Sequence, residues 1–159
     1  MTGHQLTVGR RIEATPAQVW SVITDLDRAE QVLSGVSRVQ LMTDGPYAVG
    51  TRWRETRRMF GREATLEMWV ADNDPLRRTV VEASSGATDY RTEFTLTPVG
   101  ERATALSLAF GVETPDPGAV QKLLWRVAGG LGAKATRKAL EQDLDDIAAA
   151  AESRARSST

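Results

Sequence analysis

Apolar and polar residues alternate along much of the chain before residue 111. Alternation at every second residue is typical of a β-strand with one face in a core and the other in solvent. The clearest case is a face formed by Ala64, Leu66, Met68 and Val70. Similar patterns predict seven strands, over residues 5–13, 36–43, 50–59, 63–70, 78–83, 90–96 and 104–110. Short strands joined by tight turns favour an antiparallel sheet over parallel strands joined by helices.

Other segments have apolar residues at helical spacing. Thr15 and Pro16 form a helix start, with Thr15 as the N-cap, and they predict a helix over residues 16–25. A second short helix is expected over residues 28–33. Beyond residue 117 the helical period continues for about 35 residues, or about 50 Å at 1.5 Å per residue. Three glycines within Gly129–Gly132 interrupt it, and we expect a bend or a close backbone approach there.

The order of these elements, together with three short sequence runs, resembles the START-like helix-grip superfamily. The runs are Ile12-Glu13-Ala14-Thr15-Pro16-Ala17-Gln18-Val19-Trp20, Val49-Gly50 and Asp74-Pro75-Leu76-Arg77. Within that superfamily the chain is most similar to the polyketide cyclase/dehydrase and lipid-transport branch, also called SRPBCC. The likeness extends over residues 5–150.

The resemblance implies an α+β helix-grip fold. A seven-stranded, curved antiparallel sheet wraps around a long C-terminal helix, two short helices lie between strands 1 and 2, and a cavity separates sheet and helix. We therefore expect residues 1–152 to form a single START-like ligand-binding domain and residues 153–159 to form a disordered tail. The superfamily includes aromatase/cyclases, lipid and sterol carriers, hormone receptors and chaperone regulators, so the fold does not by itself decide the function.

Composition narrows the possible functions. The chain has 159 residues, of which 41% are hydrophobic and 26% charged, an ordinary balance for one globular domain. A net charge of −1 lacks the basic excess of a nucleic-acid-binding domain, so we expect no nucleic-acid partner. The absence of cysteine excludes disulfides and thiolate chemistry, and the single histidine, His4, lies at the N-terminus. We expect no metal site and no cofactor.

The expected localisation follows from the absence of membrane-span and secretory-signal patterns in this sequence. No uninterrupted apolar run approaches the ~20 residues that a membrane span needs, and the N-terminus lacks the pattern of a secretory signal. We therefore expect a cytoplasmic protein without stable membrane insertion, and either a monomer or a homodimer.

The apolar face of the strands and the apolar stripe of the long helix supply the expected ligand-binding residues. We expect a small hydrophobic ligand to contact Val39, Leu41, Trp53, Leu66, Met68, Val81, Tyr90, Thr92, Phe94, Leu106, Leu108 and Phe110 from the sheet, and Leu124, Val127, Ala128 and Leu131 from the helix. Concave apolar spaces are the usual ligand sites. The alternative is that the same side chains fill a solid core.

Candidate catalytic groups are few: Arg57, Tyr90 and Glu55. If Trp53 faces inward, the two-residue period of a strand carries Glu55 and Arg57 inward as well. Charges on an apolar face are costly unless paired or solvated, so these two would form a polar patch for ligand oxygen atoms. The alternative is an outward, solvated edge. The hydroxyls of Tyr90 and Thr92 are suited to bond a ligand carbonyl or phenol, or simply to pack.

Two functions from different classes follow from these expectations. The first is a carrier or sensor for a lipid, isoprenoid or polyketide-like molecule. The second is a cyclase/dehydrase-type enzyme that orients a reactive poly-carbonyl chain and moves protons through Arg57, Tyr90 or Glu55, because orientation alone supplies much of a rate enhancement. A third is an interaction or regulatory protein without a ligand. The sequence leaves open whether any reaction is catalysed.

Overall fold

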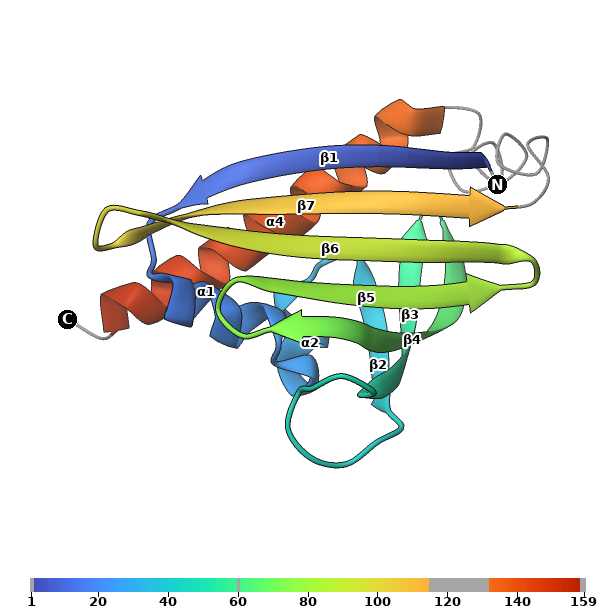
Figure 1. Ribbon diagram of the computed structural model, residues 1–159, viewed down its shortest axis with the longest axis horizontal. Coiled ribbons are helices and arrows are strands. Elements are labelled where there is room, and N and C mark those ends of the chain that lie inside the picture. The colour runs from blue at the N-terminus through green and yellow to red at the C-terminus, as the bar shows by residue number, and fades with distance from the viewer. Residues whose placement is uncertain (1, 60, 115–131, 158–159) are drawn as a thin grey trace.

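The computed structural model describes residues 2–59, 61–114 and 132–157 (Figure 1). The described residues form one sheet of seven strands: β1 (Thr2–Ile12), β2 (Val36–Leu41), β3 (Arg52–Met59), β4 (Arg62–Asp74), β5 (Arg78–Ser85), β6 (Thr88–Val99) and β7 (Ala103–Thr114). The spatial order is β1-β7-β6-β5-β4-β3-β2, and each neighbouring pair is antiparallel. The predicted antiparallel sheet is confirmed.

Short helical segments connect β1 to β2. Helix α1 (Pro16–Ile23) begins as predicted, because the Thr15 hydroxyl accepts a hydrogen bond from the Gln18 backbone N–H while the Gln18 side chain accepts one from the Thr15 N–H. A 3₁₀ turn, η1 (Leu26–Arg28), leads into helix α2 (Ala29–Val32). The two short helices expected between the first two strands are confirmed.

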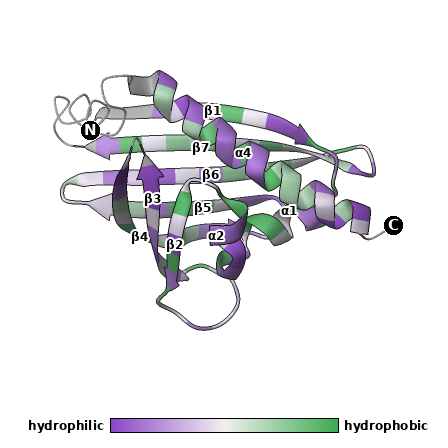
Figure 2. Ribbon diagram, turned by 180° about the vertical axis from the view of Figure 1, so that it is seen from behind, coloured by the Kyte–Doolittle hydropathy of each residue, from purple (hydrophilic) through white to green (hydrophobic). Residues whose placement is uncertain are grey.

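The long helix α4 (Gly132–Ser157) lies across the sheet on the same side as α1 and α2 (Figures 1 and 2). It packs against β1 and β7 and against both short helices. Its predicted apolar stripe is buried at Leu144, Ile147 and Ala151. The arrangement confirms the expected helix-grip fold. None of the described helices is both long and apolar enough to cross a membrane.

The C-terminal part of α4 differs from the expectation of a disordered tail beginning at residue 153. Residues 153–157 are helical. Arg154 accounts for much of this order, because its guanidinium donates to the Ser21 hydroxyl at 2.8 Å and lies 3.5 Å from the Asp25 carboxylate. The N-terminal part of the predicted helix, residues 118–131, lies outside the described residues, as do Gly129 and Gly130 with their expected bend.

Within the part of the chain that the structure describes, buried apolar side chains form two clusters. The main core joins β1, α1, β6, β7 and α4, and consists of Val8, Ile12, Ala14, Val19, Val22, Leu96, Leu106, Leu108, Leu144, Ile147, Ala148 and Ala151. The small core lies in the other half of the sheet and consists of Trp53, Val70 and Val81, with Leu26, Val39, Tyr47 and Met68 packed against it. The sheet therefore carries a separate cluster in each half.

The turn between β4 and β5 holds Leu76 at a φ of 72°, a left-handed conformation that glycine adopts without steric cost. The Leu76 side chain is 46% exposed, so its removal loses little packing. Leu76→Gly should raise the free energy of unfolding, measured by urea denaturation, by about 0.5 kcal/mol. The same replacement at Leu41, which is 43% exposed in strand β2, should lower it by about 1 kcal/mol. Equal losses at the two positions would contradict backbone strain at Leu76.

Candidate ligand-binding site

The strand register places the predicted sheet residues on one face, called the inner face below. Trp53 lies opposite Met68, which lies opposite Ala83. Ala83 in turn lies opposite Tyr90, and Tyr90 opposite Val112. Directly opposed residues of antiparallel strands point to the same side of a sheet, so this row crosses β3 to β7 on one face. Residues two or four positions along each strand share that face.

The other predicted sheet residues join the inner face through the same register: Val39, Leu41, Leu66, Val81, Thr92, Phe94, Leu106, Leu108 and Phe110. Helix α4 covers this face, because Leu108 and Leu144 both belong to the main core. Leu41 is the most exposed of the set, in keeping with its place on the edge strand β2. The predicted helix contacts Leu124, Val127, Ala128 and Leu131 lie outside the described residues. Ligand contact by any of these residues stays a prediction.

Two large side chains of the inner face lie outside both described cores. Trp53, Val81, Leu106 and Leu108 are buried, and each belongs to one of the two cores. Leu66 and Tyr90 are only half-buried, and they belong to neither core. Large apolar side chains outside both clusters are what a ligand-binding space between sheet and helix requires.

Tyr90 contributes a polar group to this apolar face. Its ring stacks on Phe110, with ring centroids 6.2 Å apart and planes inclined by 26°. No side chain or backbone group within residues 2–59, 61–114 and 132–157 is hydrogen-bonded to its hydroxyl. Burial raises the pKa of Tyr90 above its ordinary value, so the phenol stays protonated at neutral pH. Tyr90 can therefore donate a hydrogen bond to a ligand oxygen.

Glu55 and Arg57 also point to the inner face, where they meet Asp143 of α4. The Arg57 Nε–H donates to Glu55 Oε1 at 2.7 Å, while its terminal nitrogens lie 3.1 Å and 2.8 Å from the two Asp143 carboxylate oxygens. The Trp53 indole N–H donates to the other Glu55 oxygen at 3.2 Å. We call Glu55, Arg57 and Asp143 the Arg57 cluster. It ties β3 to α4 through a guanidinium that binds two carboxylates.

The Arg57 cluster decides between the alternatives that the sequence left open for this strand. Trp53 is 3% and Glu55 8% exposed, so the strand faces inward and is not an outward, solvated edge. The inward-facing charge of Arg57 is paired with Asp143, and the sequence analysis missed this partner. A signal was present, because Asp143 follows Leu140 by three residues and precedes Ile147 by four, which places it on the buried side of the helix. Whether the cluster also bonds a ligand oxygen stays a prediction.

The electrostatics of the cluster are those of one cation between two anions. Burial alone would lower the pKa of Arg57, but Asp143 and Glu55 together hold it above its ordinary value. Burial raises the pKa of Asp143, and the attraction of Arg57 only partly offsets this. The Arg57 guanidinium is therefore permanently charged, and each of its three nitrogens contacts one of the protein's own carboxylates.

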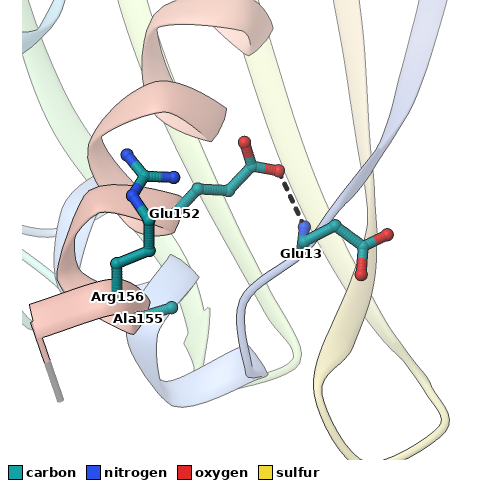
Figure 3. A pocket seen from close by; sticks show the side chains of 4 residues that line it. All are labelled: Glu13, Glu152, Ala155 and Arg156. Carbon is teal, nitrogen blue, oxygen red and sulfur yellow. Dashed lines mark hydrogen bonds between the residues drawn. The ribbon is translucent and has the colours of Figure 1, made fainter. Parts of the chain in front are cut away.

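Two surface pockets formed by described residues lie away from the inner face. The first, of about 380 Å³, is bounded by Glu13, Glu152, Ala155 and Arg156 (Figure 3). There Glu152 Oε2 accepts a hydrogen bond from the Glu13 backbone N–H at 2.9 Å. The second, of about 370 Å³, lies in the loop between β2 and β3, residues 43–51. Neither includes a predicted ligand-binding residue. Within the described chain, no group of three His, Cys, Asp or Glu side chains is placed to hold a metal ion.

Comparison with known proteins gives the sequence and structural context. Residues 3–152 match the sequence family described as polyketide cyclase/dehydrase and lipid transport. The Zhui aromatase/cyclase from Streptomyces sp. R1128 has a similar structure, with a TM-score of 0.74, 20% identity and coverage of 99% of this chain and 98% of that one. A protein from Thermus thermophilus has a TM-score of 0.74 and 20% identity, with coverage of 95% of this chain and 99% of that one. A norcoclaurine synthase from Thalictrum flavum has a TM-score of 0.70 and 16% identity, with coverage of 92% of each chain. No curated protein matches the sequence significantly.

Replacing Arg57 should leave Glu55 and Asp143 as neighbouring carboxylates without a cation. Arg57 is 31% exposed, so Arg57→Met should lower the free energy of unfolding at pH 7 by about 2 kcal/mol, between the effects of exposed and buried ion pairs. The loss should shrink toward pH 4, because protonation of Asp143, whose pKa is already raised in the folded state, removes unpaired charge.

The matched control is Arg54→Met, on the same strand but exposed on the opposite face. It should change the free energy of unfolding by no more than about 0.5 kcal/mol at either pH. Urea denaturation of the three proteins at both pH values tests this. A pH-independent loss in Arg57→Met would contradict the charge argument.

Proposed function

Because the chain belongs to the polyketide cyclase/dehydrase and lipid transport family, we propose that it binds a small hydrophobic ligand between the inner face of the sheet and the C-terminal helix. The ligand is of the lipid, isoprenoid or polyketide-like class. The binding residues are those of the inner face, among them Leu66, Tyr90 and Thr92.

The observation that carries this proposal is that part of the inner face lies outside both described cores. Two cores anchor the sheet, one on each side, while the half-buried Leu66 and Tyr90 belong to neither. Apolar surface left outside a core costs free energy, and a bound hydrophobic molecule recovers it. The aromatic pair Tyr90–Phe110 offers a flat contact surface for such a molecule.

A larger side chain placed in the proposed space distinguishes a binding site from a solid core. Thr92 lies opposite Val81 and Phe110 on the inner face. If the space is real, Thr92→Phe should keep the free energy of unfolding within about 0.5 kcal/mol of the original protein and should reduce binding of the neutral dye Nile red at least tenfold. In a solid core the larger ring should cost about 1–3 kcal/mol.

Thr97→Phe provides the matched control, because Thr97 lies on the outer face of the same strand and is exposed. It should leave both dye binding and stability unchanged. Fluorescence titration and urea denaturation measure the two quantities. Absence of dye binding in the original protein, together with destabilisation by Thr92→Phe, would defeat the proposed function.

A second candidate function, catalysis of the cyclase/dehydrase type, is favoured by the Tyr90 hydroxyl. It is a neutral phenol without a hydrogen-bond partner among the described residues, and such a group can donate to a carbonyl oxygen as charge develops there. Arg57 and Glu55, the other catalytic candidates, would contribute through orientation rather than as free acid or base, since they are bound to each other and to Asp143 or Trp53.

Catalysis through this phenol is tested by replacing each of the two tyrosines of the chain in turn. Tyr90→Phe should lower turnover of a linear poly-ketone about a hundredfold while changing its affinity by less than about threefold. Tyr47→Phe is the control, because the Tyr47 hydroxyl is already hydrogen-bonded to Thr79 at 2.7 Å. Turnover is followed by mass spectrometry. Equal rates in the two variants would remove Tyr90 from the mechanism.

A further inference from the structure

The charges of the inner face restrict which hydrophobic ligand it can hold. Resting on the proposed function, we infer that the site takes a neutral oxygenated ligand, such as an alcohol, ketone or phenol, and rejects a ligand with a free carboxylate. The inference deepens the proposed function by naming the chemistry of the ligand's polar end.

The first step is the state of the inward-facing cations. Within the described strands, three arginines share a phase with the inner-face residues: Arg10 lies opposite Leu106, Arg57 opposite Ala64, and Arg62 opposite Met59. Arg62 is exposed at the start of β4, four residues before Leu66. The other two are engaged by carboxylates of α4: Arg57 by Asp143, and Arg10 by Asp145. A carboxylate ligand usually depends on an arginine whose paired N–H groups are available for a bidentate contact. For Arg57, the Asp143 carboxylate of α4 already makes that bidentate contact.

The second step is the charge balance. The Arg57 cluster contains one guanidinium and two carboxylates, which leaves one negative charge in excess. Asp146, one turn of helix α4 away from the cluster, adds further negative potential at Asp143. An anionic ligand beside this cluster would meet repulsion in a partly desolvated space, where charges interact more strongly than in water. A neutral ligand meets no such repulsion.

The third step is the position of the cluster relative to the apolar face. Glu55 lies directly opposite Val39 on one side and Leu66 on the other. Its second oxygen is bonded to Trp53, which opposes Met68. The excess negative charge is therefore part of the same surface as the proposed ligand contacts, while the Tyr90 phenol offers a neutral hydrogen-bond donor on that surface.

A pair of probes that differ only in the polar end tests the inference. Dodecan-1-ol and dodecanoate should be titrated against Nile red at pH 8, where the acid is ionised. We expect the alcohol to bind at least tenfold more tightly than dodecanoate. Equal affinities, or tighter binding of dodecanoate, would overturn the inference while the proposed function stands. Failure of Nile red and of both probes to bind would instead defeat the proposed function.

Variants that remove the excess negative charge of the Arg57 cluster test whether this charge selects the ligand. Asp143→Asn makes the cluster neutral and weakens the hold on Arg57, so the affinity for dodecanoate should rise at least fivefold while that for dodecan-1-ol stays constant. Glu141→Gln is the matched control, because Glu141 is an exposed residue of the same helix and loses the same charge. It should change neither affinity.

Asp143→Asn could disturb the packing of α4 on the sheet, so Glu55→Gln serves as a second variant. It should raise the affinity for dodecanoate in the same way. Circular dichroism and urea denaturation check the fold of each variant. An unchanged ratio of the two affinities in a folded Asp143→Asn or Glu55→Gln protein would show that the cluster does not select the ligand, and the inference would be wrong.

Discussion

The fold depends on holding a single helix across the open side of a curved sheet. Apolar contacts fix α4 against β1, β7 and α1, but the opposite half of the sheet reaches the helix through charge, at the contact of Arg57 with Asp143. On the β1 side, Arg10 binds Asp145 two residues further along the helix. These two ion pairs add polar contacts between helix and sheet to the apolar contacts of the main core.

Ion pairs suit this task because their contribution to stability is small while their geometry is specific. The cost of desolvating a buried pair offsets much of its attraction, so apolar residues of equal size would stabilise the fold as well. Such residues, however, would lack the directional contact that Arg57 makes with both Asp143 oxygens. A bidentate guanidinium–carboxylate contact joins β3 to α4 in a defined geometry.

The sequence predicted the parts of this structure that rest on local patterns. Period-two alternation gave the strands and the inner face, and Thr15 with Pro16 gave the start of α1. The partner of Arg57 lies 86 residues away. The helical spacing of Asp143 signals that this carboxylate is buried, but not which side chain it contacts. The order of residues 153–157 was missed for the same reason, since it depends on Arg154 reaching Ser21 and Asp25. The positive φ of Leu76 opposes the backbone preference of leucine and has no sequence signal.

The same contacts bear on the choice between carrier and catalyst. A general acid needs a route by which its proton is replaced, usually a hydrogen-bonded neighbour or a water chain. Tyr90 has no such neighbour among the described side chains, and the carboxylates of the Arg57 cluster are held by Arg57 and Trp53. A carrier and a cyclase would both use the Tyr90 phenol as a hydrogen-bond donor to a ligand oxygen. A cyclase would add rate enhancement by holding its substrate in a reactive shape.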